Sequence, residues 1–398
     1  MRSPGWRSLI LPLVVGCVCA TTVVRVPVKS KAADDGLFLI HYGAKWGYMD
    51  RQGKIVIAPQ FDDAGDFFGG RAKVRKQEKW GYIDASGRLA IDFQFDNAED
   101  FKEGLAAVQV NRRWGFVRPD GGFAIEPKFV GVAGFSEGLA RFESWTTVIC
   151  DRLDPSQPNS FTSNNAPFRA FRLHDGPPFP GGGCFPADLR YGFADKSGTI
   201  AIAPKLYDAR DFSEGLAVAK DGNADSHYGY VDRTGKWTIP PQFDQSFSFR
   251  EGLAAVDVGS AVQASDKIAG RWGFVDHRGN FAIAPAFHEI QSFSEGLAAV
   301  RANRGGWGFI SPRGNFVVPP RYSEVQAFSE GIALVWSNDQ PDGYYIDKKG
   351  TRILAPAIPA QWPFSDGLTV AGTEGERKYL DRDGRIVAPY ETKSPPPR

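Results

Sequence analysis

Residues 101–129 read FKEGLAAVQVNRRWGFVRPDGGFAIEPKF, and this stretch decides the fold. It holds three short apolar runs, Leu105–Val108, Trp114–Val117 and Phe123–Ile125, separated by segments rich in Gly, Pro and charged residues. Short β-rich runs bounded by such residues are typical of strands. The stretch therefore predicts a three-stranded antiparallel meander. Pro127 is expected to end the ladder, because proline has no N–H to donate.

The connection between the second and third strands has its own signature, Asp-x-x-Gly. It occurs as Asp50 to Gly53 and as Asp84 to Gly87, among others. A type I turn favours Asp at its first position and Gly at its fourth. Two copies place a proline, Pro119 or Pro312, at the second position, where this turn prefers proline. The pattern predicts a tight turn in each copy.

The whole pattern recurs along the chain with a period of about 35 residues, which marks a repeat architecture. Each copy has an aromatic-Gly pair, the Asp-x-x-Gly step, an apolar run ending in Pro, and a closing Phe-x-Glu-Gly-Leu-Ala. Nine units are expected between residues 37 and 390, the last two degenerate. The repeat aromatics, expected to pack between neighbouring sheets, are Trp46, Trp80, Trp114, Tyr191, Tyr228, Trp272 and Trp307.

This ordered string of motifs resembles the WG-repeat family, which is named for the Trp-Gly pair and is common in bacterial proteins. The resemblance covers residues 37–390 apart from one insertion. It implies an all-β repeat domain that serves as a binding or scaffold module. It implies no family-wide catalytic residues.

Neighbouring units must stack, because a three-stranded sheet cannot bury both of its faces alone. The stack is expected to be either an open superhelix or a propeller-like ring. Propellers often close by sharing one blade between the two chain ends. Here the first and last units both look complete, which favours the open array.

The N-terminal residues predict export. Residues 1–20 combine Arg2 and Arg7 with a short apolar run and small residues, which is the pattern of a signal peptide. Two alternatives stay open: a lipoprotein signal with lipid on Cys17, and an uncleaved anchor over residues 8–24. All three place the protein outside the cytoplasm, as a periplasmic, cell-surface or secreted chain. Residues 21–36 are interpreted as a linker and residues 391–398 as a disordered tail.

One insertion interrupts the repeats at about residues 143–190. It is rich in Pro, Asn and Gly and predicts a loop without a core of its own. Cys150 and Cys184, the two cysteines outside the signal region, are expected to form a disulfide worth roughly 3–4 kcal/mol. Its aromatic residues either contact a partner or pin the loop onto the scaffold; the binding candidates are Trp145, Phe168, Phe171 and Phe179.

Composition excludes several classes of function. The 398 residues carry 47 Lys+Arg against 46 Asp+Glu, a net charge of +1, so no basic face for nucleic acid is expected. Five His and four Cys without ligand spacing predict neither a metal nor a cofactor. One turn Asp per unit is too few for calcium. The Glu residues of Phe-x-Glu-Gly either form an acidic strip or satisfy turn N–H groups and neighbouring cations.

These observations predict a non-enzymatic binding or scaffold protein of the cell envelope, with a protein or glycan partner. No catalytic residue is assigned, because the common nucleophile, phosphate-binding and dinucleotide motifs are missing. The membrane is expected to contribute only through an N-terminal lipid or anchor. The alternative is an envelope glycan or peptide hydrolase with a carboxylate pair in a groove of the array.

Overall fold

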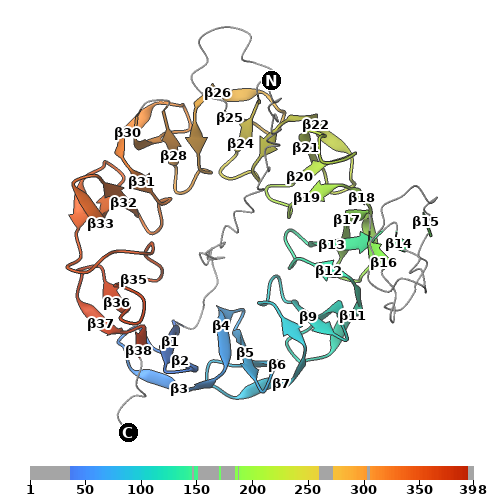
Figure 1. Cartoon of the computed structure of the whole chain (residues 1–398), viewed down its shortest axis with the longest axis horizontal. Helices are drawn as coiled ribbons and strands as arrows, with labels where there is room; N and C mark the ends of the chain where they lie inside the picture. Colours follow the sequence, from blue (N-terminus) through green and yellow to red (C-terminus); the bar gives the residue numbers. More distant parts are fainter. Residues whose placement is uncertain are drawn as a thin grey trace, which may run out of the picture.

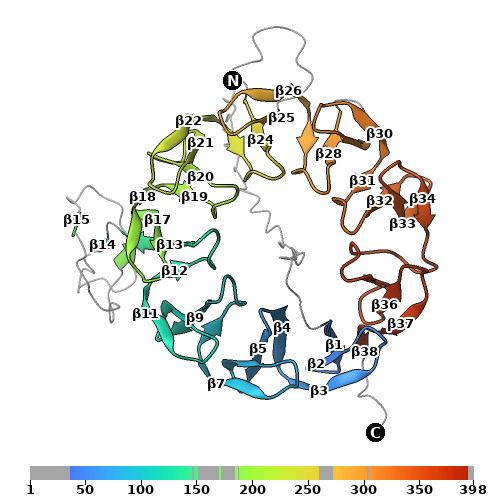
Figure 2. The same cartoon turned by 180° about the vertical axis from the view of Figure 1, so that it is seen from behind.

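The computed structural model describes residues 36–145, 148–150, 170–171, 184–186, 188–259, 272–302 and 305–392. These residues form strands, turns and loops, and none of them forms a helix able to cross a membrane. Nine small sheets follow one another around a ring, as Figures 1 and 2 show from opposite sides. The described part of the chain is therefore an all-β propeller of nine blades.

Blade 3 shows how each blade is built. It contains β8 (Asn97–Ala98), β9 (Ala106–Val110), β10 (Arg113–Val117) and β11 (Phe123–Phe129), in the order β11-β10-β9-β8. The last three strands are the predicted meander, but β11 continues through Pro127 to Phe129, so the expectation that Pro127 ends the ladder was wrong. The short strand β8 was not predicted: it follows the outer strand of blade 2 and pairs antiparallel with β9. The four strands of the blade are therefore consecutive in the chain.

The other blades repeat this plan. Blade 1 contains β1 (Phe38–Tyr42), β2 (Lys45–Met49) and β3 (Ile55–Phe61); blade 2 contains β4 (Asp63–Phe68), β5 (Arg71–Lys76), β6 (Lys79–Ile83) and β7 (Leu89–Phe95). Blade 4 contains β12 (Gly131–Val132), β13 (Leu139–Trp145), β17 (Leu189–Asp195) and β18 (Ile200–Leu206); blade 5 contains β19 (Asp208–Ala209), β20 (Ala217–Lys220), β21 (Tyr228–Val231) and β22 (Trp237–Phe243).

Blade 6 contains β23 (Gln245–Ser246), β24 (Ala254–Asp257), β25 (Trp272–Val275) and β26 (Phe281–Phe287); blade 7 contains β27 (Glu289–Ile290), β28 (Ala298–Arg301), β29 (Trp307–Ile310) and β30 (Phe316–Tyr322). Blade 8 contains β31 (Glu324–Val325), β32 (Ile332–Ser337), β33 (Gln340–Asp347) and β34 (Arg352–Leu354); blade 9 contains β35 (Leu368–Ala371), β36 (Lys378–Asp381) and β37 (Ile386–Pro389). The predicted type I turns join the second and third strands, as in the bond from Gly53 N to Asp50 O at 3.0 Å.

The hydrophobic core lies between adjacent blades rather than within one. In one such cluster Phe116 and Phe129 of blade 3 pack with Phe135 and Phe142 of blade 4. Phe135 lies between β12 and β13, and Phe142 lies in β13. The rings of Phe116 and Phe135 are 4.7 Å apart, and those of Phe129 and Phe142 are 4.9 Å apart. Because each blade buries both faces against its neighbours, no blade has a complete core of its own.

The ring is closed by the C-terminal segment. Strand β38 (Glu391–Thr392) pairs with β1 in parallel, and Tyr390 O accepts a bond from His41 N at 2.8 Å. Tyr379 of blade 9 donates its hydroxyl to Leu39 O at 2.8 Å. Of the two arrangements expected, the propeller-like ring is therefore the observed one. The apparent completeness of both end units is no obstacle, because β38 supplies the short strand of blade 1.

The C-terminal tail begins later than the sequence predicted. The tail was expected to begin at residue 391, but Glu391 and Thr392 belong to the closing strand. Two residues with no apolar periodicity give no strand signal, so the sequence did not reveal them. Residues 393–398 lie outside the described residues.

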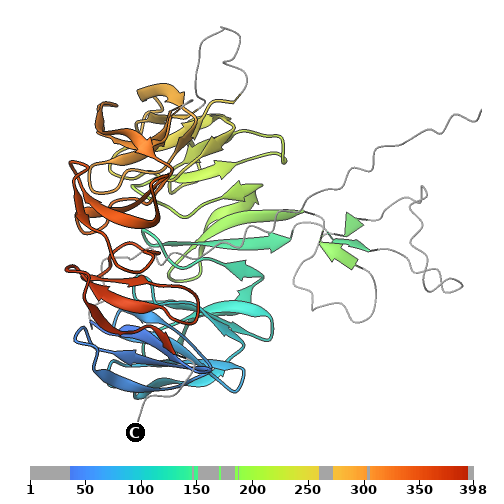
Figure 3. The same cartoon turned by 60° about the vertical axis from the view of Figure 1, so that its left-hand side comes forward.

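The insertion leaves the ring at blade 4. β13 and β17 pair along their length up to Trp145 opposite Leu189. Beyond them β14 (Val148–Cys150), β15 (Ala170–Phe171) and β16 (Cys184–Pro186) form a separate small sheet. Figure 3 shows this sheet projecting away from the ring. The described parts of the insertion thus include regular structure, whereas the composition predicted only a loop.

Candidate functional site

The glycine of each aromatic-Gly pair permits two strands to cross closely. At Gly115 a Cβ atom would lie 2.5 Å from Ile125 O, on the outer strand. The register shifts at this point, so that Trp114 pairs with Phe129 while Phe116 pairs with Ile125. A side chain here would push the outer strand away. Blades 1 to 7 share this feature, at Gly47, Gly81, Gly115, Gly192, Gly229, Gly273 and Gly308.

The Phe-x-Glu-Gly residues form tight two-residue hairpins that join the first two strands of a blade. Their acids have positive φ, near 50°, which is uncommon for a residue with a side chain. Each carboxylate accepts a backbone N–H from the hairpin of the next blade, as from Gly138 to Glu103 at 2.9 Å. We call these acids the inter-blade belt. The belt acids with such a bond are Glu103, Glu137, Glu214, Glu251, Glu295 and Glu330.

Cations from the next blade complete this belt. Lys196 Nζ lies 3.3 Å from Glu103, Lys348 Nζ 3.3 Å from Glu295, and Arg382 Nη2 2.9 Å from Glu330. Burial alone would raise the pKa of Glu103. Hydrogen bonds from the backbone N–H groups of Gly138 and Glu137 and from Lys196 have the larger opposite effect, so the pKa is lowered overall. The carboxylates thus satisfy turn N–H groups and neighbouring cations, as the second sequence interpretation expected.

The aspartates of the Asp-x-x-Gly turns accept hydrogen bonds from within their own turns. Asp195 Oδ1 accepts bonds from Ser197 Oγ at 2.6 Å and from the backbone N of Ser197 and Thr199. The Ser197 hydroxyl and these N–H groups lower the pKa of Asp195. Within the described residues no three His, Cys, Asp or Glu side chains come together as a metal site.

The residues predicted to bind a partner are only partly placed. Trp145 ends β13 and is half-buried. Phe171 lies in β15, whereas Phe168, Phe179 and the lipid candidate Cys17 lie outside the described residues. Cys150 and Cys184 are direct Cα partners on antiparallel strands. The Cα atoms of such partners are about 4.5–5.5 Å apart, a separation that a disulfide can span. The Cys150–Cys184 disulfide remains a prediction, and this strand pairing is compatible with it.

The repeat aromatics lie where the strands cross, half-buried and packed against the clusters between blades. They are Trp46, Trp80, Trp114, Tyr191, Tyr228, Trp272 and Trp307. Cations cover some of them: Lys220 Nζ is 4.6 Å from the ring centre of Tyr228. Their position favours a packing role over a contact role.

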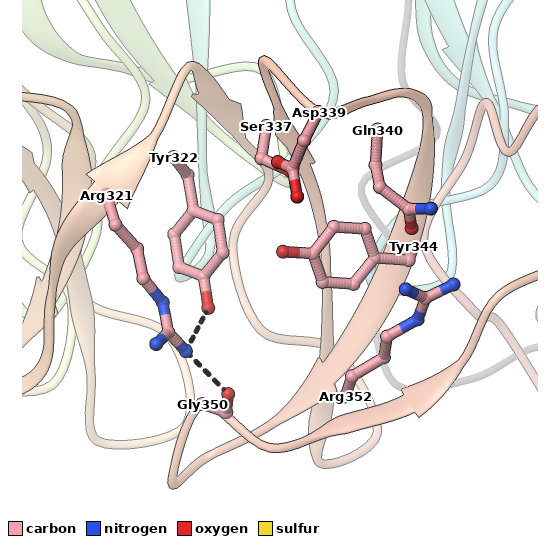
Figure 4. A pocket seen from close by; sticks show the side chains of 8 residues that line it. All are labelled: Arg321, Tyr322, Ser337, Asp339, Gln340, Tyr344, Gly350 and Arg352. Atoms are coloured by element: carbon pink, nitrogen blue, oxygen red, sulfur yellow. Dashed lines mark hydrogen bonds between the residues drawn. The ribbon is translucent and has the colours of Figure 1, made fainter.

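A pocket of about 420 Å³ lies between blades 7 and 8, at a place that the sequence analysis did not single out. Its wall comes from the end of β30, the hairpin between β32 and β33, and β34. Figure 4 shows its lining: Arg321, Tyr322, Ser337, Asp339, Gln340, Tyr344, Gly350 and Arg352. The only hint in the sequence was the degenerate Gly343-Tyr344-Tyr345.

The hydrolase alternative requires two acids facing a substrate. The pocket contains one carboxylate, Asp339. Elsewhere Glu99 and Asp100 lie 3.3 and 3.4 Å from the same Lys73 Nζ, and burial raises the pKa of Asp100. Both acids thus serve an ion pair between blades 2 and 3, and neither lines this pocket.

Comparison with known proteins identifies the repeat. A family model described as WG containing repeat matches residues 46–80, 80–114, 114–144, 191–223, 228–260, 272–304 and 307–338, more than half of the chain. The chain belongs to the WG-repeat family. No match extends beyond residue 338, and blades 8 and 9 are the two without the aromatic-Gly pair. A repeat propeller of this kind is typical of interaction and scaffold proteins.

Similar solved structures are distant from this WG-repeat protein. The computationally designed Ika8 protein has 11% identity and a TM-score of 0.43, covering 86% of this chain and all of its own. BamB from Moraxella catarrhalis has 10% identity, a TM-score of 0.37 and coverage of 77% and 92%. Sqt1 from Saccharomyces cerevisiae has 9% identity, a TM-score of 0.34 and coverage of 79% and 91%. No curated protein matches the chain.

Proposed function

We propose that this WG-repeat protein is an exported, non-enzymatic binding scaffold of the cell envelope. The observation that carries the proposal is the insertion, whose separate sheet β14–β16 projects from blade 4 of a closed ring. The proposal assigns recognition of a protein or glycan partner to this sheet and its loops. The signal peptide predicted at residues 1–20 supports the proposed location.

The ring suits this role because it holds the insertion rigidly. β13 and β17 form seven consecutive pairs between blade 4 and the base of the insertion. Blade 4 is fixed in turn by the belt, through Glu103 from blade 3 and through Glu137 to Gly215 of blade 5. A binding loop on such a support loses little entropy in the scaffold when a partner docks.

The decisive experiment removes the insertion without disturbing its base. Because Trp145 and Leu189 are Cα partners, residues 146–188 can be replaced by Asn-Gly, which suits a two-residue hairpin. The matched control shortens the connection between β24 and β25: residues 258–271 are replaced by Asn-Gly between the partners Asp257 and Trp272. Both variants and the parent chain are used to capture partners from envelope extract.

The proposal predicts a partner that the parent and the loop control retain and the insertion variant loses. All three chains should unfold cooperatively at similar temperatures. Equal capture by all three, or no partner for the parent, contradicts the assignment. An insertion variant that fails to fold contradicts the independence of ring and insertion.

A further inference from the structure

Blade 8 departs from the repeat at the point where blades 1 to 7 need glycine. In blade 7 a Cβ at Gly308 would lie 2.6 Å from Val318 O, where the outer strand crosses. The corresponding residue of blade 8 is Tyr344, and Gly343 takes the place of the tryptophan. The close crossing seen in blades 1 to 7 is therefore sterically impossible here.

The outer strand of blade 8 ends early as a result. β30 of blade 7 has seven residues and reaches the pair Trp307–Tyr322. β34 has only three residues and ends with Leu354 opposite Tyr345. The outer strand does not cover Tyr344, which is half-buried, and the pocket lies at this place. The cavity lies where Gly343 and Tyr344 replace the Trp-Gly pair of the repeat.

A second departure gives the pocket its charge. The first residue of the outer strand is apolar in the other eight blades: Ile55, Leu89, Phe123, Ile200, Trp237, Phe281, Phe316 and Ile386. In blade 8 it is Arg352. Its guanidinium carbon lies 4.9 Å from the ring centre of Tyr344, so the arginine is held against the pocket wall.

A second arginine is fixed on the other side. Arg321 Nη2 donates to Tyr322 Oη at 2.9 Å and to Gly350 O at 2.8 Å, and its guanidinium lies 5.1 Å from the Tyr322 ring centre. Among the described residues neither Arg321 nor Arg352 has a carboxylate within 4.0 Å. Two positioned guanidinium groups with free donors suit an oxyanion.

The remaining lining is polar and uncharged apart from Asp339. In Figure 4 the Asp339 and Ser337 side chains lie across the pocket from Arg321 and Arg352, with the two phenol rings between. Gln340 and Asp339 offer acceptors for hydroxyl groups. A volume of about 420 Å³ is in the range of small-molecule sites.

We propose that this pocket binds a small acidic sugar, with Arg321 and Arg352 holding its carboxylate or phosphate and Asp339 and Gln340 accepting its hydroxyl groups. The site lies between blades 7 and 8, and the projecting sheet is on blade 4. The proposal is therefore independent of the partner-binding role of the insertion. It assigns a ligand class to a place where the repeat is broken.

Titration calorimetry of the purified chain tests it with four probes: glucuronate, glucose 6-phosphate, glucose and inorganic phosphate. At least one of the two acidic sugars should bind saturably at about 1 mM or below, and glucose should bind much more weakly. The better of the two identifies the anionic group. No saturable binding of either acidic sugar, or phosphate bound as tightly as glucose 6-phosphate, overturns the proposal.

Two variants locate the binding. Arg352→Ile introduces the residue type of the other blades, so the fold should be kept, and binding should weaken about tenfold or more. Arg321→Ala should have a similar effect. The matched control is Lys128→Ala, since Lys128 also donates to a glycine of the next blade, Gly198, at 3.1 Å. Unchanged affinity in Arg352→Ile, or equal loss in the control, places the ligand elsewhere and refutes the site.

Discussion

The acids of the inter-blade belt occupy a backbone conformation that glycine or asparagine adopts more easily. Glu295 has φ 54°, yet its carboxylate reaches Gly331 N at 2.8 Å and Lys348 Nζ at 3.3 Å. Local strain in a folded protein persists only where the surrounding structure compensates for it. We infer that a bond to the next blade compensates here. The repeated Glu is thus explained by packing of the ring.

Substitution of Glu295 by Ala tests this inference. The variant keeps the strained backbone and loses both contacts, so the free energy of unfolding should fall by about 1–2 kcal/mol. Glu324→Ala is the matched control, because Glu324 is exposed, and a change within about 0.5 kcal/mol is expected. Chemical denaturation measures both. Equal midpoints for Glu295→Ala and the parent would rule out a stabilising belt.

The turn aspartates predict a loss of stability in acid. The pKa values of Asp84, Asp195 and Asp232 are lowered, first by the hydroxyl of Ser86, Ser197 or Thr234 and then by turn N–H groups. The folded pKa lies below the unfolded value of about 3.9, so their stabilisation is complete above that value. It is lost as the pH falls through the folded pKa.

We therefore expect the thermal midpoint to drop between about pH 4 and pH 2, while these groups add no pH dependence between pH 5 and 8. Differential scanning calorimetry across this range measures it. The triple Asp→Asn variant at residues 84, 195 and 232 should show a shallower acid decline. The same slope in parent and variant would show that these turns are not responsible.

At the scale of strands, much of the blade could be predicted from the sequence. Trp114–Val117 and Phe123–Ile125 are short apolar runs between strong turn signals. Asn97–Ala98 could not be predicted, because two residues carry no periodicity and their partner β9 lies in the next unit. The pocket could not be predicted either. It depends on the early end of β34, whereas the change to Tyr344 signals only a departure from the repeat.

The insertion carries a prediction at this scale. Because Cys150 and Cys184 are Cα partners, we expect the chain exported through an oxidising compartment to have no free thiol at these positions. The double Cys→Ser variant should lower the local stability of the insertion by up to roughly 3–4 kcal/mol. The insertion should then be cut faster by proteases. Mass spectrometry after alkylation without reductant detects the bond. Two alkylated cysteines in the native chain would contradict the prediction.

At the scale of the molecule, the ring explains why repeats of unequal quality stay together. Blades 8 and 9 lack the aromatic-Gly pair, but each is held between two neighbours. Blade 9 packs on blade 1 in one cluster with Ile40, Met49 and Leu368, and Arg51 lies against Gly367. Closure thus gives the degenerate blades two interfaces. This contact joins residues more than 300 positions apart, and no local pattern predicts it.

The most direct test of the closed ring is a cross-link across its seam. His41 and Glu391 are Cα partners, so His41→Cys with Glu391→Cys should react efficiently with a short bifunctional maleimide. The control pairs Glu391→Cys with Gln109→Cys, the position opposite the short strand of blade 3. The ring predicts an intramolecular link in the seam pair, found by peptide mass spectrometry, and none in the control. An unlinked seam pair in the folded protein would contradict closure and indicate an open array.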